Sequence, residues 1–365
     1  MTSSTYPRNP YLDNEPLPVD IVLHPSWWNR HEGISFDPDF FFHPVRRIED
    51  ERRMERALYE RWGRFGLGEN HQRDLPQVGA VHLAAGFLLS EMMGCPVRYE
   101  ENSSPTVMPA DRTDLRIDVD AAFRSPVWKK YETMLAALKE KHGYLTGDAN
   151  WSGILNLGLD LRGQDIFIDI LERPDQTRRL FAGIAELIER FTAIVSGETH
   201  STSISVNRNV RHIPKPVFLH SECTHTMISN QDYRSVLWEF DRRWNAKYRP
   251  YGIHFCGSDP HRFAEDFAAL PGLDFLDVGW GGDVKTLRAH LPQTFLNIRL
   301  SPVEMVHKTQ DEVRAEIRRL VKDSDNPYLT GVCCINMDDQ VPDATITAIF
   351  ETVAELRREY ATALA

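Results

Sequence analysis

No run of apolar residues in this sequence reaches the roughly 18 that a membrane-spanning helix needs. Residues 1–20 are polar and contain prolines, without the basic start and apolar run of a secretory signal, so we expect a cytoplasmic protein. Internal repeats of short period and low-complexity tracts are also missing. The formal net charge of −11 gives a surface that repels nucleic-acid phosphates and anionic lipids, so neither is an expected partner.

Cysteine is scarce, with five residues in a chain of 365. An odd number in a chain of this size argues against a disulfide framework and favours a reducing compartment with free or metal-bound thiols. Four of the five lie in the second half of the chain, close to histidines. The cysteines are Cys95, Cys223, Cys256, Cys333 and Cys334.

Apolar runs alternate with amphipathic helices from about residue 76 onward. Before them, residues 1–45 are expected to form an irregular arm, whose aromatic residues we interpret as packing rather than as a cofactor site, and residues 46–62 a helix. We therefore divide the chain into an arm and helix over 1–75 and one domain over 76–365. The predicted strands are 77–84, 143–149, 202–206, 216–221, 251–256, 274–279, 294–299 and 329–335.

Helix boundaries between these strands are well marked. Pro174 opens one helix and Gly197 ends it. Ser229 with Asp232 caps a second helix, and Thr309 opens a third with a capping box. Regular β/α alternation predicts a parallel sheet, and eight units favour a closed (β/α)8 barrel over an open sheet. No glycine-rich phosphate fingerprint follows the first predicted strand, which weakens a dinucleotide-binding alternative.

The active site of a parallel barrel is built from the carboxyl ends of its strands, so we examined these positions first. His254 and Cys256 lie two apart on one strand and therefore face the same side. An imidazole and a thiolate make half of a tetrahedral zinc site. Cys333 and Cys334 end the last strand, and because neighbours alternate, only one of them faces the barrel mouth. A strand cysteine is more often a buried small hydrophobe, so the metal site is one of two interpretations.

Other strand ends carry polar and aromatic side chains. Glu222 follows an apolar strand and is predicted to be a fourth metal ligand or a general base, with a solvated loop residue or a helix-capping partner as the alternative. The remaining candidates would contact substrate, with simple packing or hydrogen bonding as the alternative. They are Asp148, Asn150, His220, Trp280 and Asp283.

The segment from Gly147 to Ile184, and the segment from His225 that runs into the H-F-C-G strand end at His254, resemble the uroporphyrinogen decarboxylase superfamily. The resemblance covers residue 76 to the C-terminus and points to the zinc-dependent methyltransferase branch. In that branch H-x-C and a distant cysteine bind zinc, and these positions match His254, Cys256 and, in the context G-V-C-C-I, Cys333. The arginine-rich signature of true decarboxylases is missing, which makes porphyrin decarboxylation an unexpected reaction.

The resemblance implies methyl transfer between a corrinoid (cobalamin) cofactor and a thiol or a methylated small molecule such as a methyl ether or methylamine. Zn²⁺ is the implied metal. The corrinoid is expected on a separate partner protein, because no D-x-H-x-x-G type cobalamin-binding signature is present. A zinc-free decarboxylase acting on a small acid, and a non-catalytic barrel within a methyl-transfer complex, are the alternatives. The methyl donor, the direction of transfer and a homodimer are left open.

Overall fold

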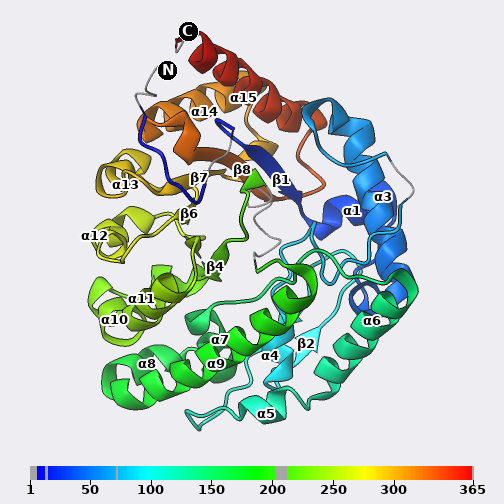
Figure 1. Cartoon of the computed structure of the whole chain (residues 1–365), viewed down its shortest axis with the longest axis vertical. Coiled ribbons are helices and arrows are strands. Elements are labelled where there is room, and N and C mark those ends of the chain that lie inside the picture. The colour runs from blue at the N-terminus through cyan, green and yellow to red at the C-terminus, as the bar shows by residue number, and fades with distance from the viewer. Residues whose placement is uncertain (1–5, 13–14, 71–72, 203–211, 364–365) are drawn as a thin grey trace.

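The computed structural model describes residues 6–12, 15–70, 73–202 and 212–363 (Figure 1). Within them, six parallel strands form one curled sheet in the order β1-β8-β7-β6-β5-β4. Nearly every residue of these strands is buried, as parallel strands covered by helices require. The strands are β1 (Val19–Leu23), β4 (Phe218–Ser221), β5 (Tyr251–His254), β6 (Phe275–Val278), β7 (Phe295–Leu300) and β8 (Thr330–Met337).

A helix or helix pair follows each strand from β4 onward and lies outside the curled sheet (Figure 1). This confirms the predicted β/α alternation from residue 216 onward, where each of the five predicted strands has a counterpart. The predicted capping boxes at Ser229 and Thr309 are both formed. These helices are α10 (Asn230–Val236), α11 (Trp238–Lys247), α12 (Ala264–Ala268), α13 (Val284–His290), α14 (Gln310–Ser324) and α15 (Asp343–Ala363).

The expectation of an irregular arm over residues 1–45 is wrong for Val19–Leu23. This segment forms β1, which pairs with β8 in parallel register, for example Asp20 with Cys333. Four apolar residues around Asp20 were enough to form a strand because β8 offers an edge for pairing and both faces of the strand become buried. The aromatic residues that follow are packed as expected, with Trp27 and Trp28 at most 1% exposed. The predicted division near residue 75 stays a prediction.

The predicted strands over 77–84 and 143–149 are also wrong, because a single parallel bridge between Gln77 and Thr146 stands in their place. The two segments pair only at this point, where Val78 donates to the carbonyl oxygen of Thr146 and Thr146 to that of Pro76. A Cβ at Gly79 would lie 2.3 Å from the carbonyl oxygen of Asp148, so only glycine allows this close approach. Most of the predicted strand over 202–206 lies outside the described residues. The fold is a curled, barrel-like half-sheet, and closure of eight strands is not shown.

The remaining regular elements of the first half of the chain are mostly helices. Pro174 begins α9 as predicted, although the helix continues past Gly197. Among the described residues, no helix combines the length and apolar character that crossing a bilayer demands. These helices are α1 (Pro25–Glu32), α2 (Pro38–Phe42), α3 (Pro44–Trp62), α4 (Leu88–Met92), α5 (Val119–Ala122), α6 (Pro126–His142), α7 (Ile154–Arg162), α8 (Asp165–Glu172) and α9 (Pro174–Thr199), beside the short hairpin of β2 (Val97–Arg98) and β3 (Thr106–Val107).

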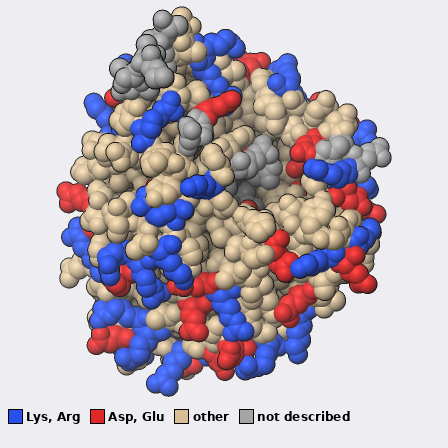
Figure 2. All heavy atoms as spheres, in the orientation of Figure 1, with Lys and Arg blue, Asp and Glu red and all other residues tan. Residues whose placement is uncertain are grey.

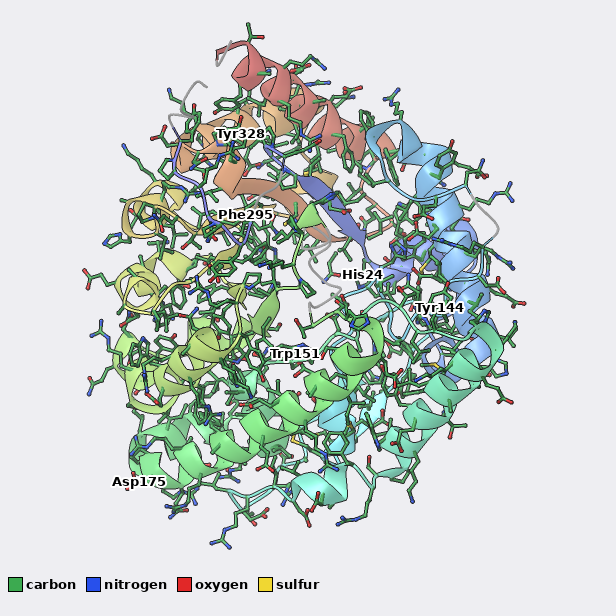
Figure 3. All side chains as sticks on the ribbon, viewed as in Figure 1. His24, Tyr144, Trp151, Asp175, Phe295 and Tyr328 are labelled. Atoms are coloured by element: carbon green, nitrogen blue, oxygen red, sulfur yellow. The ribbon has the colours of Figure 1, made fainter. Side chains whose placement is uncertain are left out.

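The face viewed in Figure 1 is hollowed near its centre (Figure 2). Lysine and arginine side chains are interspersed with aspartate and glutamate over this face, so no broad field of one sign surrounds the hollow. Figure 3 places Trp151 beside the centre of the ring of elements, whereas Asp175, at the start of α9, lies at its outer rim.

Candidate metal centre

Neighbouring strands β4 and β5 bring two cysteines and a histidine together. Ser221 pairs with His254, so the residues that end or follow these strands lie side by side. The ligand atoms of Cys223, His254 and Cys256 all lie within 4.8 Å of one another. Sequence reasoning singled out His254 and Cys256 but overlooked Cys223. Its place two residues beyond β4, on the strand next to the His-x-Cys pair, is the signal that could have found it.

The ring of His254 is held from both sides. Nδ1 is hydrogen-bonded to the carboxylate of Asp277 on β6, and Nε2 lies 2.7 Å from Sγ of Cys256. An ionised carboxylate only accepts hydrogen bonds, so Nδ1 carries a proton and Nε2 is the nitrogen that can bind a metal. Carboxylates in this position are typical partners of metal-binding histidines, because they fix the tautomer and the ring orientation.

The three residues of the group perturb one another's protonation. The hydrogen bond from Cys223 holds the pKa of the Cys256 thiol well below its usual range, and His254 and Arg299 act in the same direction against burial. The same hydrogen bond, together with burial, raises the pKa of Cys223. Burial lowers the pKa of His254, but the charges of Cys256 and Asp277 outweigh it and raise that pKa to about 9. These shifts favour an ionised Cys256, a neutral Cys223 thiol and a protonated His254.

Cys333 belongs to the same hydrogen-bond network without belonging to the group of three. Nδ2 of Asn297 donates to Sγ of Cys333 at 3.2 Å and to Asp277 at 3.1 Å. Burial and the charge of Asp277 raise the pKa of Cys333. Sγ of Cys334 instead donates to the carbonyl oxygen of Leu300, on the opposite side of β8. The assignment of Cys333 as a metal ligand stays a prediction.

Glu222 is fully buried and is engaged by the start of α7. The backbone N–H of Leu155 donates to its Oε1 at 2.7 Å, and Nε2 of His220 lies 3.0 Å from the same oxygen. Oε2 has no hydrogen-bond partner among the described residues. One oxygen therefore caps a helix, which was the alternative interpretation from the sequence, while the other is uncommitted. Its roles as ligand or base stay predictions.

His220 faces the helical layer rather than the metal group. Its Nδ1 lies 2.7 Å from the carboxylate of Asp241 on α11, and Trp151 stacks on its ring with centroids 6.2 Å apart. Burial lowers the pKa of His220, but Asp241 and Glu222 outweigh it and raise that pKa to about 9. The His220 ring thus lies between two carboxylates, and its Nε2 also accepts from the backbone N–H of Ile154 at 3.2 Å.

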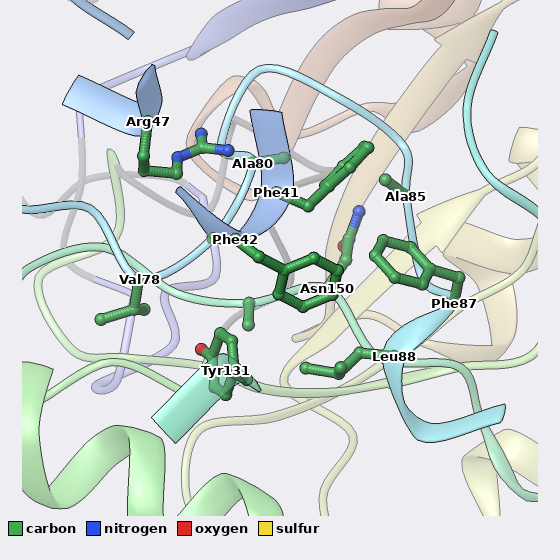
Figure 4. Close-up of a pocket in the computed structure, with 12 residues that line it drawn as sticks. Phe41, Phe42, Arg47, Val78, Ala80, Ala85, Phe87, Leu88, Tyr131 and Asn150 are labelled. Atoms are coloured by element: carbon green, nitrogen blue, oxygen red, sulfur yellow. The ribbon is translucent and has the colours of Figure 1, made fainter. Parts of the chain in front are cut away.

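Of the other predicted substrate residues, Trp280 and Asp283 follow β6, whereas Asp148 and Asn150 lie just after the Gln77–Thr146 bridge. Asp148 accepts a hydrogen bond from Ser201 at 3.3 Å. Asn150 donates to the carbonyl oxygen of Leu83 and lines a separate cavity with aromatic walls (Figure 4). Trp280 is 39% exposed, and Asp283 accepts from the backbone N–H of Thr286 at the start of α13. Their contacts with substrate stay predictions.

A second cluster of ligand-type side chains, Glu51, Glu55 and His82, is buried near the cavity of Figure 4. Nε2 of His82 lies 3.0 Å from Glu51 and 2.8 Å from Glu55. Nη2 of Arg47 donates to Glu51 at 3.1 Å. Both carboxylates therefore already have partners on Arg47 and His82 within the protein.

Similarity to known proteins is found by comparing structures and not by comparing sequences. No protein-family model and no curated protein matches the chain. A solved methyltransferase from Methanosarcina mazei superposes with a TM-score of 0.65 at 15% identity, covering 94% of this chain and 95% of its own. A B12-independent methionine synthase from Shewanella sp. W3-18-1, in complex with selenomethionine, gives a TM-score of 0.52 at 11% identity, with 96% and 99% covered.

The chain has the fold of these two methyltransferases. This likeness is one of fold, and the resemblance to the uroporphyrinogen decarboxylase superfamily is consistent with it. In barrels of this kind the carboxyl ends of the strands form the active site, and that is where Cys223, His254 and Cys256 lie.

The donor set fits zinc. Two sulfurs and one imidazole suit Zn²⁺ better than Mg²⁺ or Ca²⁺, which prefer oxygen. A catalytic zinc site needs three protein ligands and one open position, and the group of three supplies that number. Cys333 and Oε2 of Glu222 are the further donors that the nearby strands offer.

Proposed function

We propose that this chain is a zinc-dependent methyltransferase, which moves a methyl group between a corrinoid cofactor on a separate protein and a thiol or methylated small molecule. The observation that carries the proposal is the group of Cys223, His254 and Cys256, with ligand atoms within 4.8 Å, at the carboxyl ends of adjacent strands. Its fold, shared with two methyltransferases, supports the same conclusion.

In this proposal each residue of the site has a separate role. His254, Cys256 and either Cys223 or Cys333 would hold the zinc ion, and Asp277 would keep Nδ1 of His254 protonated so that Nε2 is free to bind. Bound zinc lowers the pKa of a coordinated thiol, which keeps a nucleophilic thiolate available at neutral pH. Glu222 would occupy the exchangeable fourth position or take the proton of the incoming thiol.

Elemental analysis followed by a transfer assay tests the proposal. Protein purified under reducing conditions should contain about one zinc per chain, and it should accelerate methyl transfer from free methylcobalamin to small thiols. The matched control is Cys256→Ser, which should lose both properties while keeping its helical circular-dichroism signal. Protein that takes up no zinc after reconstitution, or zinc protein that transfers no methyl group to or from any thiol, ether or amine, would contradict the proposal.

A further inference from the structure

Arg299 is a buried cation with unused hydrogen-bond donors. It lies on β7, pairs in register with Cys333 and is 8% exposed. Its Nε and Nη1 have no hydrogen-bond partner among the described residues. A guanidinium carries five N–H donors, and burying a charged donor without a partner costs free energy. Such an arrangement is expected where a ligand supplies the missing acceptor.

A ligand bound by Arg299 would lie next to Cys256 of the proposed zinc site, because Arg299 is surrounded by residues of that site. Burial opposes the charge of Arg299, but Cys256, Asp277 and Cys333 outweigh it and raise its pKa, and its guanidinium is hydrogen-bonded to Cys256. These are the residues that form or border the proposed zinc site. Once Cys256 gives its charge to a metal ion, Arg299 loses part of its anionic environment and gains capacity for another anion. Asp277, held by His254 and Asn297, has its own partners.

We infer that Arg299 binds a carboxylate on the small molecule whose sulfur exchanges the methyl group. The inference rests on the proposed function and deepens it, because it names the substrate class as a short thiol acid or its S-methyl derivative. Arg299 contacts Cys256 directly, so the carboxylate and the reacting sulfur are separated by a chain of only a few atoms. A hydrogen bond from a charged donor to a carboxylate is strong enough to select such a molecule over a neutral one.

Equilibrium binding tests the inference without turnover. Isothermal titration of zinc-loaded protein would compare 3-(methylthio)propionate with 3-(methylthio)-1-propanol, which have similar size and differ in charge. Wild-type protein should bind the carboxylate about 10- to 100-fold more tightly. Arg299→Gln should abolish this preference, Arg299→Lys should keep part of it, and Arg242→Gln, on the exposed face of α11, should keep all of it.

Equal binding of the two compounds by wild-type protein, or binding of neither, would overturn the inference even if Arg299→Gln does not fold. A retained preference in folded Arg299→Gln would overturn it as well. Kinetics then separate it from the proposed function. With methylcobalamin as donor, 3-mercaptopropionate should have a lower KM than 3-mercapto-1-propanol. Arg299→Gln should raise the KM for 3-mercaptopropionate and leave the KM for 3-mercapto-1-propanol unchanged. Carboxylate-selective binding without any methyl transfer would contradict the proposed function alone, whereas equal KM values would contradict the role of Arg299 alone.

Discussion

Sγ of Cys256, two residues beyond β5, lies 2.7 Å from Nε2 of His254, the last residue of that strand. Zinc bonds of about 2.3 Å to sulfur and about 2.0–2.1 Å to nitrogen place the two atoms roughly 3.5 Å apart in a tetrahedral site. Binding a metal ion would therefore increase the distance between these two atoms by less than about 1 Å. Because Asp277 holds the far side of the ring, the movement falls mainly on Cys256.

Removing the Cys256 thiol should remove the metal but not the fold. In Cys256→Ser we expect at least tenfold weaker zinc binding and a melting temperature of the metal-free protein within a few degrees of wild type. The measurements are zinc titration against a chromogenic chelator and a thermal melt. A variant that loses its helical signal together with its zinc would show that the site supports the fold instead.

The observed geometry and the family resemblance predict different cysteines as the third zinc ligand. The group of three predicts that Cys223→Ser lowers zinc affinity at least tenfold, whereas the resemblance predicts this for Cys333→Ser. Cys334→Ser is the control, since its sulfur faces Leu300 and should not affect zinc. Zinc titration of the three variants decides among them. A loss of zinc in Cys334→Ser alone would show that the register assigned to β8 is wrong by one residue.

Glu222→Gln should retain zinc and lose turnover if Glu222 is the exchangeable ligand or the base. The amide can still accept from Leu155, but its loss of charge beside His220 should lower the free energy of unfolding by about 1–3 kcal/mol. Zinc content, kcat and urea unfolding measure the three effects separately. Full methyl-transfer activity with reduced stability would leave Glu222 as a helix cap only.

His220 should make folding stability depend on pH. Its pKa is raised from 6.5 to about 9 in the folded chain, so its contribution is fully present below pH 6.5 and is lost as pH rises through 9. We expect wild-type protein to lose up to about 3 kcal/mol more than His220→Gln between pH 6 and 9.5. Urea unfolding at both pH values measures this, with His290→Gln, at an exposed position, as the control. Parallel pH profiles for wild type and His220→Gln would contradict the assignment.

The sequence by itself determined the alternation of strands and helices from β4 to α15, because apolar runs, capping boxes and helix stripes are local signals. Strand periodicity also predicted that His254 and Cys256 face the same side; the two side chains do meet, although β5 ends at His254. The sequence-based prediction failed at β1 and at the segments around Gly79 and Asp148, where no strand forms. There the outcome depends on whether a distant segment offers an edge or blocks one, and no local pattern records this.

Only the tertiary structure decided which side chains meet. Cys223 and Cys256 are 33 positions apart and become neighbours through the register of β4 and β5, while Cys333, as prominent in the sequence, is hydrogen-bonded to Asn297 instead. The sequence placed Glu222 at the mouth of the barrel, but only the structure shows that its Oε1 accepts from the backbone N–H of Leu155 at the start of α7. Arg299 carried no sequence signal of its role, because an unused donor is defined by the absence of a partner in three dimensions. Proximity between strands and the satisfaction of buried polar groups are properties of packing, so the sequence could name the candidates but not choose among them.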